Sequence, residues 1–334
     1  MRMDRIIVVA FVVLVSTAIV GFSTGNTGAS FTASSTNPSN SWNTVNVQPP
    51  ATQNAVVSVA GGTVNLSWTA TPTAPNGHTI TYLVFRNATQ IGTTASLVYS
   101  DTPPADGTYS YTIQTKIAQG AGFFTSGSSN AQNGISDRVA PTVSITCNAV
   151  ACSSSTWYTV SPTVAITGTD TGIGMGTVTR NVDAGGNVSG ASPMSFTPAD
   201  GNHSIVYFGA DAAGNVAASA TQTLKVDTTA PTAATGIITA KGAAAGSITL
   251  TWTAGTDGAS GSGVSGYTIH RSGVVASCPA TNTTNYPNAT PLGVVTSATI
   301  SGLVSASKYC FYITTTDIAG NSADSVSAGP QPAR

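Results

Sequence analysis

Runs of alternating apolar and polar residues recur along most of the chain. Val64–Trp68, Tyr109–Ile113, Ile248–Trp252 and Tyr309–Ile313 carry apolar side chains at every second position. Because successive side chains of a β-strand point to opposite faces, this pattern is typical of strands with one buried face. Stretches rich in glycine, proline and asparagine separate the runs and predict turns. The pattern therefore predicts an all-β chain.

The composition supports strands over helices. All twelve acidic residues are aspartate, and only 7% of residues are charged. Glutamate and lysine, which favour helices, are therefore scarce, while threonine and valine, which favour strands, are abundant. The net charge of −1 gives no electrostatic footprint for nucleic acid. Further strand candidates are Val56–Val59, Ile80–Arg86, Thr142–Thr146, Thr163–Thr167, Ser204–Phe208 and Tyr267–Arg271.

A repeated joint divides the chain into units. Asp137–Thr142 and Asp227–Thr232 both read Asp-x-x-Ala-Pro-Thr and begin 90 residues apart. Proline fixes φ and pushes the preceding residue into an extended conformation, so each joint predicts a short, stiff and exposed link. The expected domains cover residues 51–138, 139–229 and 230–334. A linker, 30–50, and an N-terminal segment, 1–29, precede them.

The N-terminal segment has the features of an export signal. Arg2 and Arg5 precede an apolar run, Ile6–Phe22, and small polar residues follow it. This order is typical of a secretory signal, for which we expect cleavage between Ala29 and Ser30. The alternative is an uncleaved hydrophobic helix that anchors the chain in a membrane. Both possibilities predict a secreted protein or one on the extracellular cell surface.

The stretch after the signal, Ser30–Trp42, resembles the mature start of exported bacterial surface proteins of the TasA and camelysin type. The resemblance covers about a dozen low-complexity residues. It implies a Gram-positive surface or matrix setting. The alternative is a disordered linker rich in serine, asparagine and threonine.

The third unit resembles a fibronectin type III domain. Trp252 lies in its second expected strand and Tyr267 in the next. Leu303 stands six residues before Tyr309, which begins another alternating run. Fibronectin type III domains have a tryptophan, a tyrosine, and a leucine followed by a corner tyrosine at these places. The resemblance implies a seven-strand Greek-key sandwich with these four residues in its core.

The first unit repeats this order of residues. Trp68 and Tyr82 match the tryptophan and the first tyrosine, and Tyr109 matches the corner tyrosine. Pro103 stands where the family has its leucine, which is a departure from the pattern. The first unit is therefore also expected to be a fibronectin type III-like domain.

The middle unit lacks the tryptophan and tyrosine pattern but shares a turn with the third. Asp211–Asn215 and Asp317–Asn321 both read Asp-x-Ala-Gly-Asn. Gly-Asn between strand-like runs suits a hairpin turn that needs positive φ. The unit resembles bacterial immunoglobulin-like repeats, in which such a hairpin closes the domain. Together the resemblances imply three tandem immunoglobulin-like β-sandwiches.

The four cysteines predict two disulfides. Four cysteines allow three pairings, and independent domains favour Cys147–Cys152 and Cys278–Cys310. Chain entropy predicts about 2 kcal/mol for the short loop and about 4 kcal/mol for the longer one. Cys310 is expected to face away from the core, because its neighbours Tyr309 and Phe311 face into it. Zinc is the alternative, but no second close pair or nearby histidine supports it.

No residues are assigned to catalysis, to a cofactor or to a metal. The three histidines, His78, His203 and His270, fall in separate units, and glutamate, the commonest carboxylic acid of hydrolases, is absent. One alternative concerns calcium, since several aspartates at expected joints and loop ends could converge as oxygen ligands. Aspartate is also a common turn residue, which is the competing interpretation. These residues are Asp137, Asp170, Asp211, Asp227, Asp257 and Asp317.

Ligand-binding surfaces are expected only in general terms. Trp157, Tyr158, Phe123, Phe124 and Tyr286 lie outside the expected cores, and exposed rings would suit stacking on sugars. The leading hypothesis is a non-enzymatic exported surface or matrix protein, an elongated adhesion or spacer module. Its partner is an unidentified protein or polysaccharide, and it contacts a membrane only through an uncleaved N-terminus. The alternative is an accessory binding or spacer chain of secreted polysaccharide hydrolases.

Overall fold

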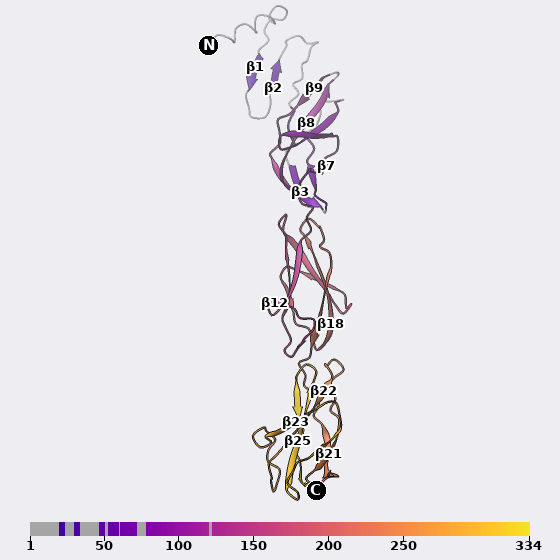
Figure 1. Ribbon diagram of the computed structural model, residues 1–334. Helices are drawn as coiled ribbons and strands as arrows, with labels where there is room; N and C mark the ends of the chain where they lie inside the picture. Colours follow the sequence, from indigo (N-terminus) through magenta and orange to yellow (C-terminus); the bar gives the residue numbers. More distant parts are fainter. Residues whose placement is uncertain are drawn as a thin grey trace, which may run out of the picture. The chain divides into compact units, whose positions relative to one another are not determined.

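All regular secondary structure in the described residues is β-strand, which confirms the predicted fold class (Figure 1). The computed structural model describes residues 20–23, 30–33, 47–50, 53–59, 61–71, 78–119 and 122–334. The chain divides into two compact units, and each is described by itself. The first comprises Met1–Pro141 with residues 170–174 and 210–215, and the second comprises the other residues.

Little of the N-terminal segment is described. β1 (Val20–Ser23) pairs antiparallel with β2 (Ser30–Ala33). The expected hydrophobic helix is therefore wrong for residues 20–23, because this end of the apolar run forms a strand. The rest of the run and Ala29 lie outside the described residues, so the cleavage site stays a prediction. Within the described part of the chain, no helix is long and apolar enough to cross a membrane.

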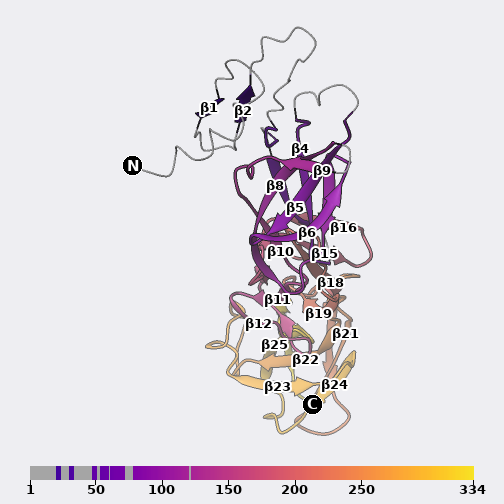
Figure 2. The same ribbon diagram turned by 90° about the horizontal axis from the view of Figure 1, so that it is seen from above.

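The first sandwich packs two sheets around one apolar core. Its strands are drawn in purple in Figure 2. Alternation along β4 (Thr63–Trp68) places Val64, Leu66 and Trp68 inward, opposite Tyr82 and Val84 of β5 (Ile80–Arg86). The strands of the smaller sheet, in spatial order, are β3 (Gln53–Val59), β4 (Thr63–Trp68) and β7 (Val98–Asp101). The larger sheet has the order β10 (Gln132–Ser136), β8 (Gly107–Gln119), β5 (Ile80–Arg86) and β6 (Thr89–Thr94), and β9 (Gly122–Thr125) also pairs with β8.

Serine hydroxyls satisfy the backbone of β8 where the chain passes from β9 to β10. Between them the backbone leaves the regular ladder, and Ser126 and Ser129 accept hydrogen bonds from the N–H groups of Thr115 and Ile113, each 2.9 Å long. Ser325 does the same for the N–H of Ile313 in the third sandwich, at 2.9 Å. The interrupted strand therefore leaves these three buried N–H groups hydrogen-bonded.

The middle sandwich also has two sheets. Its core contains Val164, Ile205 and Leu224, with Cys147 at the edge of the same cluster. One sheet has the order β12 (Val150–Ala151), β11 (Thr142–Cys147), β14 (Val164–Thr169) and β17 (Met194–Phe196). The other has the order β13 (Trp157–Tyr158), β19 (Ala220–Val226), β18 (Gly201–Asp211), β15 (Met175–Val182) and β16 (Asn187–Gly190).

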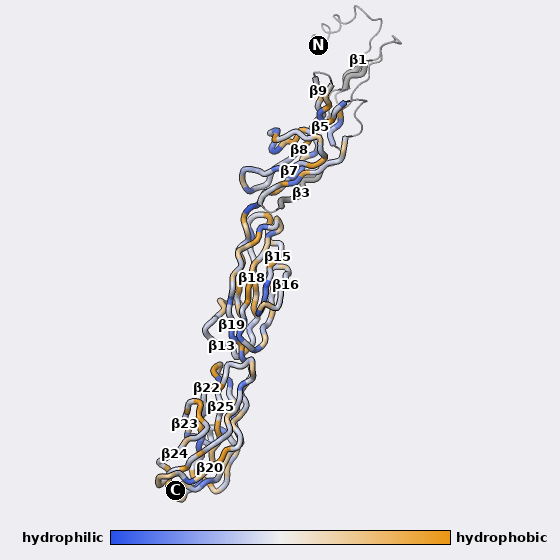
Figure 3. Tube along the Cα trace, turned by 90° about the vertical axis from the view of Figure 1, so that its right-hand side faces the viewer, coloured by the Kyte–Doolittle hydropathy of each residue, from blue (hydrophilic) through white to orange (hydrophobic). Residues whose placement is uncertain are grey.

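The third sandwich repeats the core of the first. Trp252 packs edge-on against Tyr267 with ring centroids 5.5 Å apart, as Trp68 does against Tyr82 at 5.4 Å. The alternation of apolar and polar residues appears as short orange and blue stretches along the strands (Figure 3). The smaller sheet has the order β20 (Thr235–Lys241), β21 (Ile248–Thr253) and β24 (Ser297–Ile300). The larger has β23 (Asn288–Leu292), β22 (Val264–Arg271), β25 (Lys308–Asp317) and β26 (Ser322–Asp324), and β27 (Ala328–Pro332) also pairs with β25.

The two predicted corner tyrosines, one in the first sandwich and one in the third, differ in how deeply they are buried. Tyr309 is buried, whereas Tyr109 is only half-buried at the edge of the first core. Both hydroxyls bond the backbone a few residues upstream, Tyr109 donating to Ala105 O at 2.9 Å and Tyr309 accepting from Val304 N–H at 3.1 Å. Leu303, the predicted partner of Tyr309, belongs to the third core.

The disulfides join Cys147 to Cys152 and Cys278 to Cys310. Cys310 faces away from the main core as expected, but it is buried and does not lie on an exposed outer face of the sheet. The reason is the segment between β22 and β23, which covers this face of β25. Tyr286 from that segment packs edge-on against Tyr312, with centroids 5.0 Å apart, and forms a second small core with Cys310. Tyr286 is therefore a core residue, contrary to the expectation.

Candidate functional site

The six aspartates singled out in the sequence form two triads. In the first triad, carboxylate oxygens of Asp137, Asp170 and Asp211 all lie within 4.8 Å of one another, and all three residues belong to the first unit. Asp227, Asp257 and Asp317 form the second triad with the same limit, inside the second unit. The outer members of each triad are buried and the middle one is half-buried. These are the groups of three or more possible metal-ligating side chains among the described residues.

Turn backbone positions two carboxylates of the first triad. Asp137 accepts a hydrogen bond from the N–H of Ile173 at 2.8 Å. Asp170 Oδ2 accepts two more, from Gly172 at 2.9 Å and Gly174 at 2.8 Å. Gly172 is required for this approach, because a Cβ there would collide with the Asp137 carboxylate. The glycine-rich stretch after β14 therefore serves to bring backbone N–H groups to aspartate.

The third carboxylate of the first triad is held by the turn after β18. Asp211 accepts hydrogen bonds from Asn215, through the backbone N–H at 2.8 Å and the side-chain amide at 2.7 Å. The same amide donates to the carbonyl of Asp137 at 3.0 Å, and Asn215 Oδ1 accepts from Gly61 N–H at 3.1 Å. Gly214 has φ of 95°, the positive value expected for this turn.

The second triad is built in the same way. Asn321 donates to the Asp317 carboxylate at 3.0 Å and to the carbonyl of Asp227 at 2.9 Å. Asp227 also accepts from the N–H of Ser262 at 2.7 Å. Sequence reasoning missed both asparagines as members of these sites. The signal that could have found them was the repeated Asp-x-Ala-Gly-Asn turn together with the repeated joint.

Burial decides what the triads can do chemically. Asp137 and Asp211 expose only 1% and 4% of their surface, and Asp227 and Asp317 expose 0% and 2%. A glycoside hydrolase needs two carboxylates that flank a sugar, which cannot reach oxygens buried in this way. Oxygen atoms gathered this closely could instead hold a hard cation or organise the turns through hydrogen bonds. The aspartates that begin the two joints are therefore buried, whereas the residues that follow them, Val139 and Ala140 in one joint and residues 228–230 in the other, are exposed.

The structure keeps the histidines apart. His203 forms a pair with Asp183 at 2.7 Å, and His270 stacks on Tyr312 with centroids 4.4 Å apart. Burial lowers the pKa of His203, but hydrogen bonds to Asp183 and to the Ala199 carbonyl outweigh it, so the net pKa is raised. Burial lowers the pKa of His270. His78 lies elsewhere, against the Ala118 carbonyl. The described residues therefore contain no pair of histidines placed for shared chemistry.

The candidate sugar-stacking residues have different surroundings. Phe123 and Phe124 on β9 are 60% and 48% exposed, and Lys116 Nζ lies 4.2 Å from the Phe123 ring. Trp157 and Tyr158 are half-buried, and Lys225 Nζ lies 5.9 Å from the Trp157 ring. The two phenylalanines are thus the more open aromatic pair.

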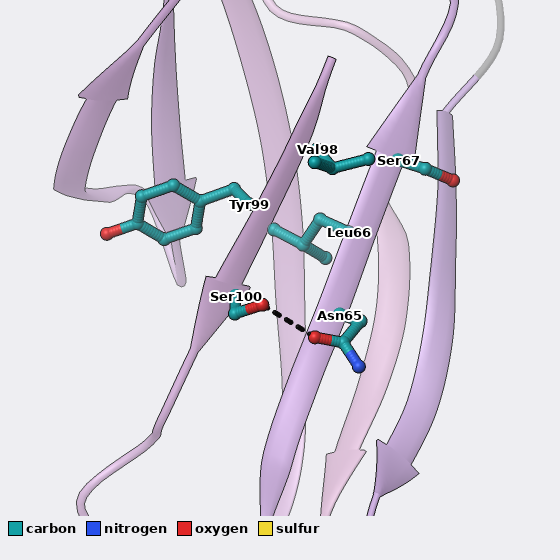
Figure 4. Close-up of a pocket in the computed structure, with 6 residues that line it drawn as sticks. All are labelled: Asn65, Leu66, Ser67, Val98, Tyr99 and Ser100. Atoms are coloured by element: carbon teal, nitrogen blue, oxygen red, sulfur yellow. Dashed lines mark hydrogen bonds between the residues drawn. The ribbon is translucent and has the colours of Figure 1, made fainter. Parts of the chain in front are cut away.

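A shallow pocket lies on the first sandwich between β4 and β7 (Figure 4). Ser100 donates a hydrogen bond to Asn65 Oδ1 at 2.7 Å, and Leu66 belongs to the apolar core. The lining contains no carboxylate, histidine, lysine or arginine side chain. The pocket is lined by Asn65, Leu66, Ser67, Val98, Tyr99 and Ser100.

Tandem β-sandwiches, two of them with a tryptophan packed against a tyrosine in the core, define the class of this chain. No protein-family model matches the chain. It is 33% identical over 274 residues to exoglucanase A of Cellulomonas fimi and 31% identical over 289 residues to exoglucanase B of the same organism. These matches cover 77% and 82% of this chain but only 29% and 24% of the exoglucanases.

Similar solved structures are sandwich modules. The fibronectin(III)-like modules of CbhA from Clostridium thermocellum align with 18% identity and a TM-score of 0.33, over 52% of this chain and 95% of theirs. A segment of titin aligns with 12% identity and a TM-score of 0.37, over 86% of this chain and 99% of its own length. The resemblance of residues 30–42 to TasA and camelysin stays a prediction, since most of that stretch lies outside the described residues.

Proposed function

We propose that the chain is a non-catalytic spacer or linker module that works alongside secreted polysaccharide hydrolases. The observation that carries the proposal is the similarity of three quarters or more of the chain to less than a third of two exoglucanases. The shared region is a minor part of each enzyme, and in this chain it consists of β-sandwiches. Such a region suits a module that separates or supports other domains rather than one that cleaves the polysaccharide. This was the alternative hypothesis from sequence, and it now replaces adhesion as the leading one.

Two structural observations support the non-catalytic role. The clustered carboxylates are buried and hydrogen-bonded to turns, so they are not placed to act on a sugar. The pocket between β4 and β7 is lined by apolar, hydroxyl and amide side chains and by no carboxylate. The two disulfides are consistent with an extracellular setting.

A linker-replacement experiment tests the spacer role. The chain would be placed between a cellulose-binding domain and an exoglucanase catalytic domain, with a flexible Gly/Ser linker of equal length as the matched control. We expect faster hydrolysis of crystalline cellulose with the chain and equal rates on a short soluble substrate, because spacing matters only on a surface. Equal rates on crystalline cellulose would contradict the spacer role, and hydrolysis by the purified chain alone would contradict a non-catalytic one.

Binding to polysaccharide is the second candidate, and the exposed pair on β9 favours it. Phe123 and Phe124 offer open rings for sugar stacking. Pull-down on cellulose, chitin and isolated cell wall separates the two candidates. Retention of the chain that is lost in the Phe123→Ala/Phe124→Ala variant would show binding, and Val326→Ala, which changes an exposed valine elsewhere, is the control.

A further inference from the structure

One oxygen of the first triad lacks a partner. Asp170 Oδ1 is buried and accepts no hydrogen bond from the described residues, whereas Oδ2 of the same carboxylate accepts two. One oxygen of Asp170 lies within 4.8 Å of oxygens of Asp137 and Asp211, so the carboxylate that carries the unpartnered atom belongs to the cluster. A buried charged oxygen without a partner is strongly unfavourable. Such a carboxylate beside two others points to a cation.

The protein's own cations do not neutralise the triad. Arg138 follows Asp137 in sequence, but its guanidinium pairs with Asp106 at 2.7 Å and also bonds the hydroxyl of Ser136. The other ion pairs of the described residues join Arg86 to Asp101 and His203 to Asp183. Three mutually close carboxylates therefore repel one another without a compensating side chain.

We propose that the first triad binds a calcium ion. Its ligands are carboxylates alone, without histidine or cysteine, which favours hard cations over zinc or copper. Calcium places its ligand oxygens about 2.3–2.6 Å away, so two of them can be about 5 Å apart, whereas the shorter magnesium bonds limit this separation to about 4.2 Å. The oxygens of the triad lie within 4.8 Å of one another, which is inside the span that calcium can bridge. Three carboxylates supply three to six oxygens, and water completes the shell.

The second triad provides an internal comparison. Each carboxylate oxygen of Asp227, Asp257 and Asp317 already accepts at least one hydrogen bond. It therefore lacks the unpartnered oxygen that marks the first triad, and the proposal is confined to Asp137, Asp170 and Asp211.

Direct binding is the first test. Equilibrium dialysis of the full chain with radioactive calcium should show binding with a Kd of roughly 10⁻⁴–10⁻³ M, the range of extracellular calcium modules. Asp170→Asn should bind one ion fewer per chain, since it removes a charge but keeps an oxygen for the glycine N–H groups. Asp324→Asn, which changes an exposed aspartate outside both triads, should bind like the natural chain. No binding, or unchanged stoichiometry in Asp170→Asn, would overturn the proposal.

Thermal unfolding separates a calcium site from a network of turns. About 10 mM calcium should raise the Tm of the natural chain, because a Kd of about 10⁻⁴ M shifts the folding equilibrium about 100-fold. Magnesium at the same ionic strength should act less. Without calcium, Asp170→Asn should match or exceed the Tm of the natural chain, since it relieves repulsion, and calcium should not raise it through this site. If Asp170→Asn has a lower Tm than the natural chain, and calcium changes the Tm of neither protein, the aspartates only organise turns. That result would overturn the proposal.

Hydrogen exchange on the unaltered chain gives a test that needs no variant. Calcium should slow exchange at least threefold in the peptides that contain Asp137, Asp170 and Asp211, because it joins three separate segments. Peptides from β5 and β8 should be unaffected. Equal exchange with and without calcium in the three peptides would contradict the proposal.

Discussion

Trp68 and Trp252 occupy equivalent positions in two separate cores, and each packs edge-on against a tyrosine. Each exposes only 6% of its surface, but neither indole N–H has a hydrogen-bond partner. Their contribution therefore comes from packing and from the apolar area that they bury, reduced by one unsatisfied donor each.

Truncation of Trp252 should destabilise the third sandwich strongly. We expect Trp252→Ala to lower the free energy of unfolding by about 3–5 kcal/mol, because it removes most of a large buried side chain. Trp252→Phe should cost less, since it keeps an aromatic ring and removes a donor without a partner. Urea unfolding followed by circular dichroism measures both. Val326→Ala, at an 84% exposed position, is the control, and a similar loss in that variant would contradict the argument.

The pair of His203 and Asp183 should make stability depend on pH. The pKa of His203 is raised above 6.5 in the folded state, so its stabilising contribution is fully present below about pH 6.5 and is lost as the pH rises through the raised value. The Tm difference between the natural chain and His203→Gln should therefore shrink between about pH 5 and pH 8. A constant difference would show that protonation of His203 is not involved.

Single residues were predicted well where one feature determines their position. Trp68, Tyr82, Trp252 and Tyr267 lie in the cores, as the resemblance to fibronectin type III domains implied. Tyr286 could not be assigned, because it is buried only by a loop that folds over the outer face of β25. Asn215 and Asn321 were missed for a similar reason, since their partners lie far away in the chain.

At the level of elements, the two disulfides constrain very different lengths of chain. Cys147 and Cys152 are 5 residues apart, whereas Cys278 and Cys310 are 32 apart. The longer bridge also packs in the second small core with Tyr286 and Tyr312. It fastens the segment that follows β22 to the outer face of β25.

Removal of the longer bridge should cost more. We expect Cys278→Ser/Cys310→Ser to lower stability by about 4 kcal/mol and Cys147→Ser/Cys152→Ser by about 2 kcal/mol, from the loop lengths alone. Thermal unfolding of the two variants under the same oxidising conditions tests this. Equal shifts would mean that loop closure does not dominate.

The strands were predictable from alternation, but their interruptions were not. β5 begins at Ile80 and ends at Arg86 as expected. At the break between β9 and β10, serine hydroxyls take the place of a neighbouring backbone group as hydrogen-bond acceptors. The sequence does not show which serines of so serine-rich a chain will do this. The two aspartate triads were predictable only in part. The sequence singled out all six aspartates, but their division into two groups of three depends on which strand ends lie close together in the fold.

At the level of the whole chain, the cores of the first and third sandwiches share no residue. The Trp68→Ala/Trp252→Ala double variant should therefore show the sum of the two single effects, within about 0.5 kcal/mol. Each substitution should shift only the unfolding step of its own sandwich, as hydrogen exchange can resolve. A coupling of more than about 1 kcal/mol would contradict independent cores.

The position of the asparagine at the end of each turn also determines when its hydrogen bond to the joint can form during synthesis on the ribosome. Asn215 bonds the carbonyl of Asp137, which is made 78 residues earlier, and Asn321 bonds Asp227 across 94 residues. At about 5–20 residues per second, the first of these bonds must wait about 4–16 s after Asp137 is added. Each of these contacts can therefore form only after most of the sandwich that follows its joint has been translated. At that point β19 of the middle sandwich, or β26 and β27 of the third, are still to be made.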